Sequence, residues 1–192
     1  MTDHYVDVVN EKDEIVSRDL KSQKKIKGFL SRTVGVFILN FENKFLICKR
    51  APHKKNDANL YDLSAYGNVI EGESYEEAAE RELLEELGIN CKLKFLDKYY
   101  QEVKNEDRMS KFFCGLFLGV SDKEPKLNEE LVEVRRMTFE EIEREIKEKP
   151  DIFCQGFKND FIKIKSQLLF YLLKKLIFCK IRGGRASTDC GI

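Results

Sequence analysis

The sequence predicts an α+β fold in which helices pack on a mixed β-sheet. Two observations support this class. Segments with strand and helix character follow one another in the order strands, helix, strands, helix. The 192 residues, 42% of them apolar, suffice for one domain with its own core. The 35% charged content argues against an integral membrane protein, and the balance of 34 basic and 34 acidic residues argues against a protein that coats nucleic acid.

The N-terminal part of the chain is predicted to form strands and turns. Residues 5–16 place β-favouring residues on both sides of polar turn residues, which predicts a hairpin. A polar, basic stretch follows at 17–28. Residues 33–50 predict two strands around a turn at 42–43, and residues 51–62 are loop-like.

The strongest predicted helix spans residues 75–87. Ser74 followed by Glu77 forms a capping box, which starts the helix at Tyr75, and Gly88 is well suited to end it. A short apolar run at 62–70 enters the glycine-containing loop before this helix. The later elements are predicted as strands at 91–103 and 110–121, a loop and strand within 128–139, a charged helix at 139–149 ended by Pro150, and a helical segment at 161–181.

Three carboxylates lie on one face of the helix at 75–87. Glu82, Glu85 and Glu86 fall within an arc of roughly 100°, whereas Leu83, Leu84 and Leu87 occupy a separate arc that is expected to face the core. Acids at this spacing repel one another, and residues 71–86 hold eight acids against one base, Arg81. Either the face is simply solvated, or it binds hard divalent cations such as Mg²⁺ or Mn²⁺.

The loop before the helix also contains functional candidates. Glu73 and Arg81 are placed to form a bidentate ion pair that would hold the loop against the helix. Gly67 and Gly72 would let the loop bend tightly and bring backbone oxygens near a metal.

These residues match a known pattern, G-x5-E-x7-R-E-U-x-E-E-x-G-U, at every fixed position. The matching positions are Gly67, Glu73, Arg81, Glu82, Leu83, Glu85, Glu86, Gly88 and Ile89. The segment therefore resembles the Nudix box. The flanking segments YVDVVNEKDEIV, FILNFENKFLICKR and YDLSAYGNVIEGES resemble the Nudix branch that is similar to isopentenyl-diphosphate isomerase. The resemblance implies a Nudix-like αβα sandwich.

The resemblance also implies roles for these residues. Glu82, Glu85 and Glu86 would bind Mg²⁺ or Mn²⁺ with help from the Gly67 carbonyl, and Glu73 and Arg81 would orient the loop and helix. The reaction would be hydrolysis of a diphosphate linkage, in a small substrate of the nucleoside diphosphate-X type, by metal-activated water.

The general base varies in this superfamily. It would be a box glutamate or a later acid, for which Glu130 or its neighbour Glu129 is the candidate; a solvated loop is the simpler interpretation of both. Many relatives have a second glycine where this chain has Tyr66, which would narrow the loop. Many relatives are dimers, so a homodimer is compatible with the resemblance.

Lys49 and Arg50 precede the loop at 51–62 and are candidates to bind substrate phosphates; protection of a strand edge is the alternative. Two other functions stay open on the same fold. One is a module that binds a nucleotide or partner without turnover, although such modules usually lose box glutamates. The other is an isomerase, which needs a catalytic Cys that the stretch at 62–66 lacks.

The chain is expected to divide into a Nudix domain at 1–160, a basic amphipathic helix at 161–181 and a disordered tail at 182–192. Residues 162–192 carry seven basic residues and one acid, and their apolar run is too short and interrupted to span a membrane. A helix docked on the domain is the simpler interpretation, and contact with a membrane surface or RNA is the functional alternative. The start of the chain shows no secretory signal, so we expect a cytoplasmic location with reduced thiols.

Overall fold

The computed structural model describes residues 3–105 and 108–181. Its centre is a seven-stranded mixed sheet in which the main path runs β5-β4-β3-β8-β7, with β6 paired to β3 and β9 paired to β4. Only β3 and β8 pair in parallel among these described strands. The strands are β3 (Ser31–Leu39), β4 (Phe45–Arg50), β5 (Tyr61–Asp62), β6 (Ala65–Asn68), β7 (Leu93–Asn105), β8 (Arg108–Val120) and β9 (Leu131–Met137).

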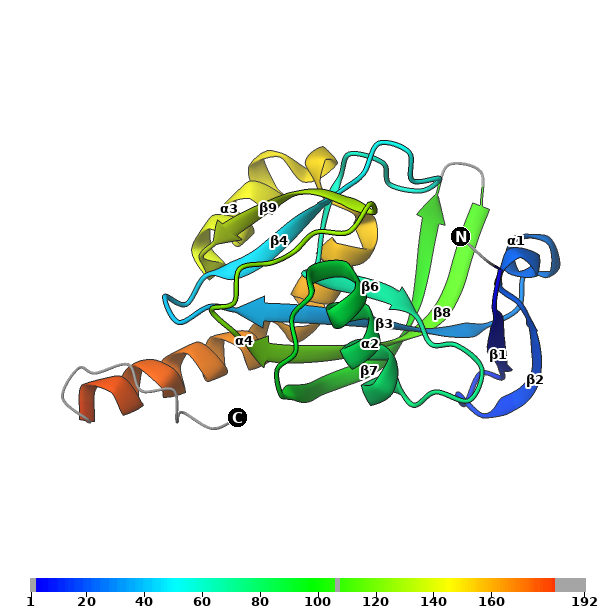
Figure 1. Cartoon of the computed structure of the whole chain (residues 1–192), viewed down its shortest axis with the longest axis horizontal. Coiled ribbons are helices and arrows are strands. Elements are labelled where there is room, and N and C mark those ends of the chain that lie inside the picture. Colours follow the sequence, from blue (N-terminus) through cyan, green and yellow to red (C-terminus); the bar gives the residue numbers. More distant parts are fainter. Residues whose placement is uncertain (1–2, 106–107, 182–192) are drawn as a thin grey trace.

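Helices cover both faces of this sheet, which confirms the predicted α+β sandwich (Figure 1). The alternation of β3 divides the core in two, because successive side chains point to opposite faces. Val34, Val36 and Ile38 pack with α2 (Tyr75–Leu87), whereas Phe37 and Leu39 pack with α3 (Phe139–Glu148) and α4 (Gln155–Ile181). We call these the α2 face and the α4 face.

The predicted N-terminal hairpin is confirmed as β1 (Tyr5–Val9) and β2 (Ile15–Leu20). Asp13, in its turn, has a φ of 63° and is buried. Its carboxylate accepts hydrogen bonds from Arg32 (2.6 Å) and Tyr75 (3.1 Å) and pairs with Lys98. This network fastens the hairpin to the domain. The basic stretch that follows folds into a 3-10 turn (Lys21–Gln23) and a short helix, α1 (Lys24–Lys27).

The C-terminal helix α4 begins at Gln155, six residues before its predicted start. Its buried side chains recur every three or four residues and belong to the core of the α4 face; they are Phe157, Phe161, Ile164, Leu168 and Leu172. The helix is therefore docked on the domain along this length. No helix of the described residues has the length and apolarity needed to cross a membrane. The predicted tail at 182–192 lies outside the described residues.

Candidate active site

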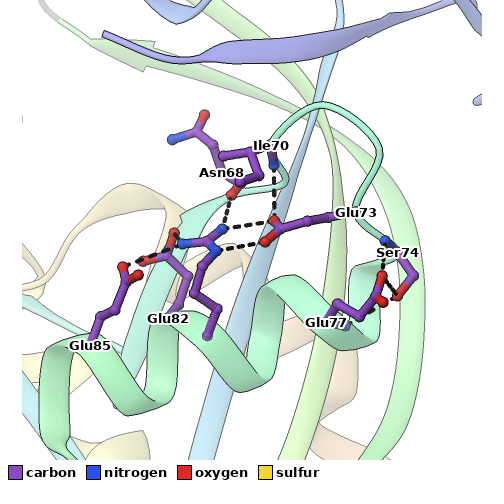
Figure 2. Close-up of polar contacts among 8 residues, drawn as sticks. Asn68, Ile70, Glu73, Ser74, Glu77, Glu82 and Glu85 are labelled. Carbon is purple, nitrogen blue, oxygen red and sulfur yellow. Dashed lines mark hydrogen bonds and ion pairs between the residues drawn. The ribbon is translucent and has the colours of Figure 1, made fainter. Parts of the chain in front are cut away.

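The helix α2 starts and ends where the sequence predicts. The Ser74 hydroxyl accepts the Glu77 backbone N–H (3.1 Å) and the Glu77 carboxylate accepts that of Ser74 (2.8 Å), which completes the capping box (Figure 2). Gly88 ends the helix with a φ of 62°. Because both ends are set by local chemistry, the register of the helix face is set as well.

The faces of α2 differ from the prediction at two positions. Leu83 and Leu87 are buried as expected, but Leu84 is 53% exposed. Glu86 instead joins the buried side and is only 6% exposed. The reason is that β6 lies against the side of the helix next to Leu83 and Leu87, on which Glu86 falls.

Arg81 joins the loop to the helix. Its guanidinium donates two hydrogen bonds to the carboxylate of Glu73 (2.7 and 2.9 Å) and a third to the Asn68 carbonyl (2.9 Å). The predicted bidentate pair is thus present (Figure 2). The remaining nitrogen reaches Glu82 (2.8 Å) and Glu85 (3.4 Å). Bonding to Glu73 raises the pKa of Arg81, so the guanidinium stays charged.

Gly67 has a steric reason to be glycine. A β-carbon added there would lie 1.9 Å from the carboxyl carbon of Glu82, far inside van der Waals contact. The absence of a side chain therefore lets the Glu82 carboxylate approach the backbone of β6 closely. Burial raises the pKa of Glu82, and the hydrogen bond from Arg81 opposes that effect.

Among the acids of the α2 face, Glu86 has the most strongly raised pKa. Its carboxylate accepts the backbone N–H of Tyr66 (3.2 Å). Burial raises its pKa to about 8, and the nearby charges of Glu82 and Glu130 add to this rise. The carboxylates of Glu82, Glu86 and Glu130 thus lie close together with too little positive charge nearby to offset their repulsion.

Glu130 is brought to this group by the loop at 121–130. Backbone hydrogen bonds join Lys126 to Leu87 (2.8 Å) and Asn128 to Glu86 (3.2 Å), so the loop is held against the end of α2. The Glu130 carboxylate pairs with Lys54, whereas Glu129 is exposed. Of the two candidate acids, Glu130 is the one whose charge raises the pKa of Glu86.

Arg50 and Lys49 lie on opposite faces of β4. Arg50 pairs with Asp62 (3.3 Å), and it follows Leu46 and Cys48 on the side of β4 that packs on the α2 face. Lys49 lies over the Tyr61 ring (5.5 Å) and near Glu133 (4.0 Å). Neighbouring strand residues point to opposite faces, so the structure does not bring Lys49 to the carboxylates of α2.

Lys21 was not singled out from the sequence. Loss of solvent lowers the pKa of this lysine, the charge of Glu82 opposes the change, and Lys54, Glu130 and Arg81 also act on it. Lys21 is exposed, and its charge interacts with that of Glu82 in the box. The only sequence signal was the basic composition of residues 17–28, because some sixty residues separate Lys21 from Glu82.

The oxygen atoms available at this site suit a hard divalent cation. They come from carboxylates and from a backbone carbonyl at Gly67, where a side chain would collide with Glu82. In this conformation no three acidic, His or Cys side chains of the described residues are grouped to hold a metal. Arg81 holds Glu82 and Glu85, and Glu86 is turned toward the Tyr66 N–H. Binding a cation would require rotation of these side chains away from Arg81 and Tyr66.

A family model for the NUDIX domain matches residues 30–155, which include all seven strands of the central sheet and α2. The chain belongs to the Nudix family. The resemblance seen in the box is therefore confirmed, and the Nudix match leaves out the β1–β2 hairpin and most of α4. Nudix hydrolases generally use divalent metal ions.

Named relatives agree with this family. The chain is 28% identical to isopentenyl-diphosphate Delta-isomerase 2 of Photorhabdus laumondii over 82% of this chain and 90% of the relative. It is 30% identical to a prenyl-diphosphate phosphatase of Methanosarcina mazei over 70% of this chain and 79% of the relative. A crystal structure from Deinococcus radiodurans, 27% identical, superposes with a TM-score of 0.65 and covers 76% of this chain and 90% of that one.

Proposed function

We propose that this Nudix protein is a Mg²⁺- or Mn²⁺-dependent hydrolase that cleaves a diphosphate linkage in a nucleoside diphosphate-X type substrate. The observation that carries the proposal is that Glu82 and Glu130 lie near Glu86, a buried acid with a raised pKa, at the place where Gly67 lets the Glu82 carboxylate approach the backbone of β6. Such an excess of carboxylates is stabilised by a divalent cation and by the phosphate that the cation attracts.

In this proposal Glu82, Glu85 and Glu86, with the Gly67 carbonyl, hold the cation. When bound, the cation neutralises phosphate charge and lowers the pKa of water. Arg81 and Glu73 hold the loop and helix in register through their paired hydrogen bonds. Lys21, Lys54 and Arg50 supply positive charge for the diphosphate, and Glu130 accepts a proton from the attacking water.

A second candidate substrate class is prenyl diphosphates. The names of two relatives favour it, since the Photorhabdus protein is named for isopentenyl diphosphate and the Methanosarcina protein for prenyl diphosphate. The cations Lys21, Arg50 and Lys54 suit a terminal diphosphate equally well.

Hydrolysis is favoured over isomerisation by the state of the cysteines. Cys48 is buried, and burial raises the pKa of its thiol well above the ordinary value; the charge of Glu86 adds to this rise. Burial also raises the pKa of the other described cysteines, Cys91, Cys114 and Cys154. None of these thiols is poised as a thiolate nucleophile at neutral pH.

The test measures phosphate or monophosphate release from a panel of nucleoside diphosphate and prenyl diphosphate compounds, with and without Mg²⁺ or Mn²⁺. Wild type is compared with Glu86→Gln and with Glu80→Gln, an exposed acid on the same helix, as the control. We expect metal-dependent release that Glu86→Gln abolishes and Glu80→Gln retains. Ligand binding without release would favour a binding module, and conversion of isopentenyl diphosphate without phosphate release would favour an isomerase.

A further inference from the structure

The side of α4 that faces away from the core exposes large apolar side chains. Ile162 is 67% exposed, Phe170 59% and Leu173 57%. At 100° per residue these three positions fall within an arc of about 80° and extend over about 16 Å of the helix. We call Ile162, Phe170 and Leu173 the outer stripe. It lies nearly opposite the buried row that contains Ile164 and Leu168, so it plays no part in docking the helix.

Lysines border the outer stripe. By helix position Lys163 and Lys174 lie along one flank of it. The Lys174 ammonium is 4.5 Å from the centre of the Phe170 ring, and Lys163 is 3.4 Å from Asp97. The sequence from 161 to 188 contains no acid, and residues 162–192 carry seven basic residues against one acidic residue. The stripe therefore combines exposed apolar area with the positive charge of Lys174 and with that of Lys163, which Asp97 partly offsets.

We propose that the outer stripe docks the protein on an anionic membrane surface. A helix with exposed apolar side chains next to lysines binds in the plane of such a surface by burying its apolar side chains at the headgroup boundary. The lysines add attraction to anionic lipids, worth about a fivefold change in binding for each residue. The helix lies on the surface, since none of the described helices is suited to cross a membrane.

A second copy of the chain fits this stripe less well. In an antiparallel pair of α4 helices, two-fold symmetry places Lys163 of one copy beside Lys174 of the other, and although Asp97 pairs with Lys163, α4 itself adds no acid between 161 and 175. RNA would use the lysines but leave the exposed Ile162, Phe170 and Leu173 without a contact that explains them.

The location of α4 is compatible with docking. Figure 1 shows the helix running beyond the edge of the sheet on the side opposite the β1–β2 hairpin. The outer stripe shares no residue with the carboxylates of α2, which lie on the other face of the sheet. Docking through α4 therefore leaves the candidate active site free.

The test is flotation of the full chain with vesicles of phosphatidylcholine alone or with 30% phosphatidylserine. We expect wild type to float with the anionic vesicles, and less so in high salt. Lys163→Gln/Lys174→Gln should lower the partition coefficient by at least about fivefold, because Asp97 offsets part of the charge of Lys163. Phe170→Ser/Leu173→Ser should lower it by at least about tenfold. Val132→Ser, at a site of 52% exposure on β9, is the matched control and should bind like wild type.

Each contrary result overturns the proposal. These results are absence of wild-type flotation, equal flotation with neutral vesicles, or unchanged flotation of both double variants. A gel shift with single-stranded RNA that the two lysine changes abolish, without vesicle binding, would assign the stripe to RNA. Wild-type dimers that both double variants convert to monomers, again without vesicle binding, would assign it to a second copy. All substituted positions are exposed, and melting temperatures check that the variants remain folded.

Discussion

Glu86 on the α2 face and Asp160 on the α4 face are both buried acids whose pKa is raised to about 8, chiefly by burial. Their neighbours differ. Glu86 is surrounded by other acids, Glu82 and Glu130, that raise its pKa further. Asp160 accepts hydrogen bonds from Tyr99 (2.7 Å) and Gln101 (2.5 Å), which lower its pKa.

The comparison shows that a perturbed pKa alone does not locate an active site. Burial perturbs both acids and the charge of Asp62 raises the pKa of each, but Glu86 is also affected by Glu82 and Glu130, which are themselves paired with Arg81 and Lys54. The Asp160 Oδ2 atom has no hydrogen-bond partner among the described residues. We expect the Asp160 side chain to be protonated at neutral pH and to have a structural role. Four experiments test this contrast.

The largest expected effect is on catalysis. Glu86→Gln should lower kcat for a diphosphate substrate by about 10³-fold, because it removes a cation ligand. Asp160→Asn should leave kcat within about twofold, because it lies on the other face of the sheet. Steady-state kinetics with saturating Mg²⁺ measure both. Equal losses in the two variants would remove the distinction between the faces.

Gly67→Ala should lower kcat/KM by about 10²-fold, because the added β-carbon would displace the Glu82 carboxylate. The effect should appear together with weaker Mn²⁺ binding in titration calorimetry. Gly156→Ala on the α4 side meets nothing within 4 Å and serves as the control. Full activity of the Gly67 variant would show that Glu82 is free to move.

Asp160 should make the free energy of unfolding depend on pH. Its folded pKa is raised above the unfolded value, so the folded state holds a proton that the unfolded state releases. Stability should fall as the pH rises from about 4 to about 8, by up to about 1.4 kcal/mol per unit, and then level off. Urea unfolding across this range should show a slope that is smaller in Asp160→Asn than in wild type, and Glu86, whose pKa is raised in the same way, accounts for the slope that remains.

The smallest effect concerns Tyr99. Tyr99→Phe removes a hydrogen bond that favours the ionised form of Asp160. We expect a loss of about 1 kcal/mol at pH 9, where Asp160 is ionised, and a smaller loss at pH 6. Urea unfolding at the two pH values measures this difference. A larger loss at pH 6 would contradict the assigned ionisation.

Local chemistry explains what could be predicted. The α2 helix begins and ends as predicted because its capping box and Gly88 act within a few residues. The hairpin turns at Asp13 and Asn43 were recognisable from turn-forming residues, and both adopt positive φ angles. The Glu73–Arg81 pair was predictable because a helix turn and a short loop set its distance. By contrast, Gly156, Asn159 and Asp160 are poor helix formers, which concealed the true start of α4.

The sequence by itself determined the fold class, the Nudix box and the register of its helix, since these depend on short-range patterns. The tertiary structure alone decided that Glu86 is buried while Leu84 is exposed, that Arg50 faces the carboxylates while Lys49 does not, and that Lys21 joins the site. The physical reason is that burial and charge depend on what packs against a residue. Partners some twenty to eighty residues away, such as Tyr66 for Glu86 or Glu130 for Lys54, are brought together only by the folded sheet.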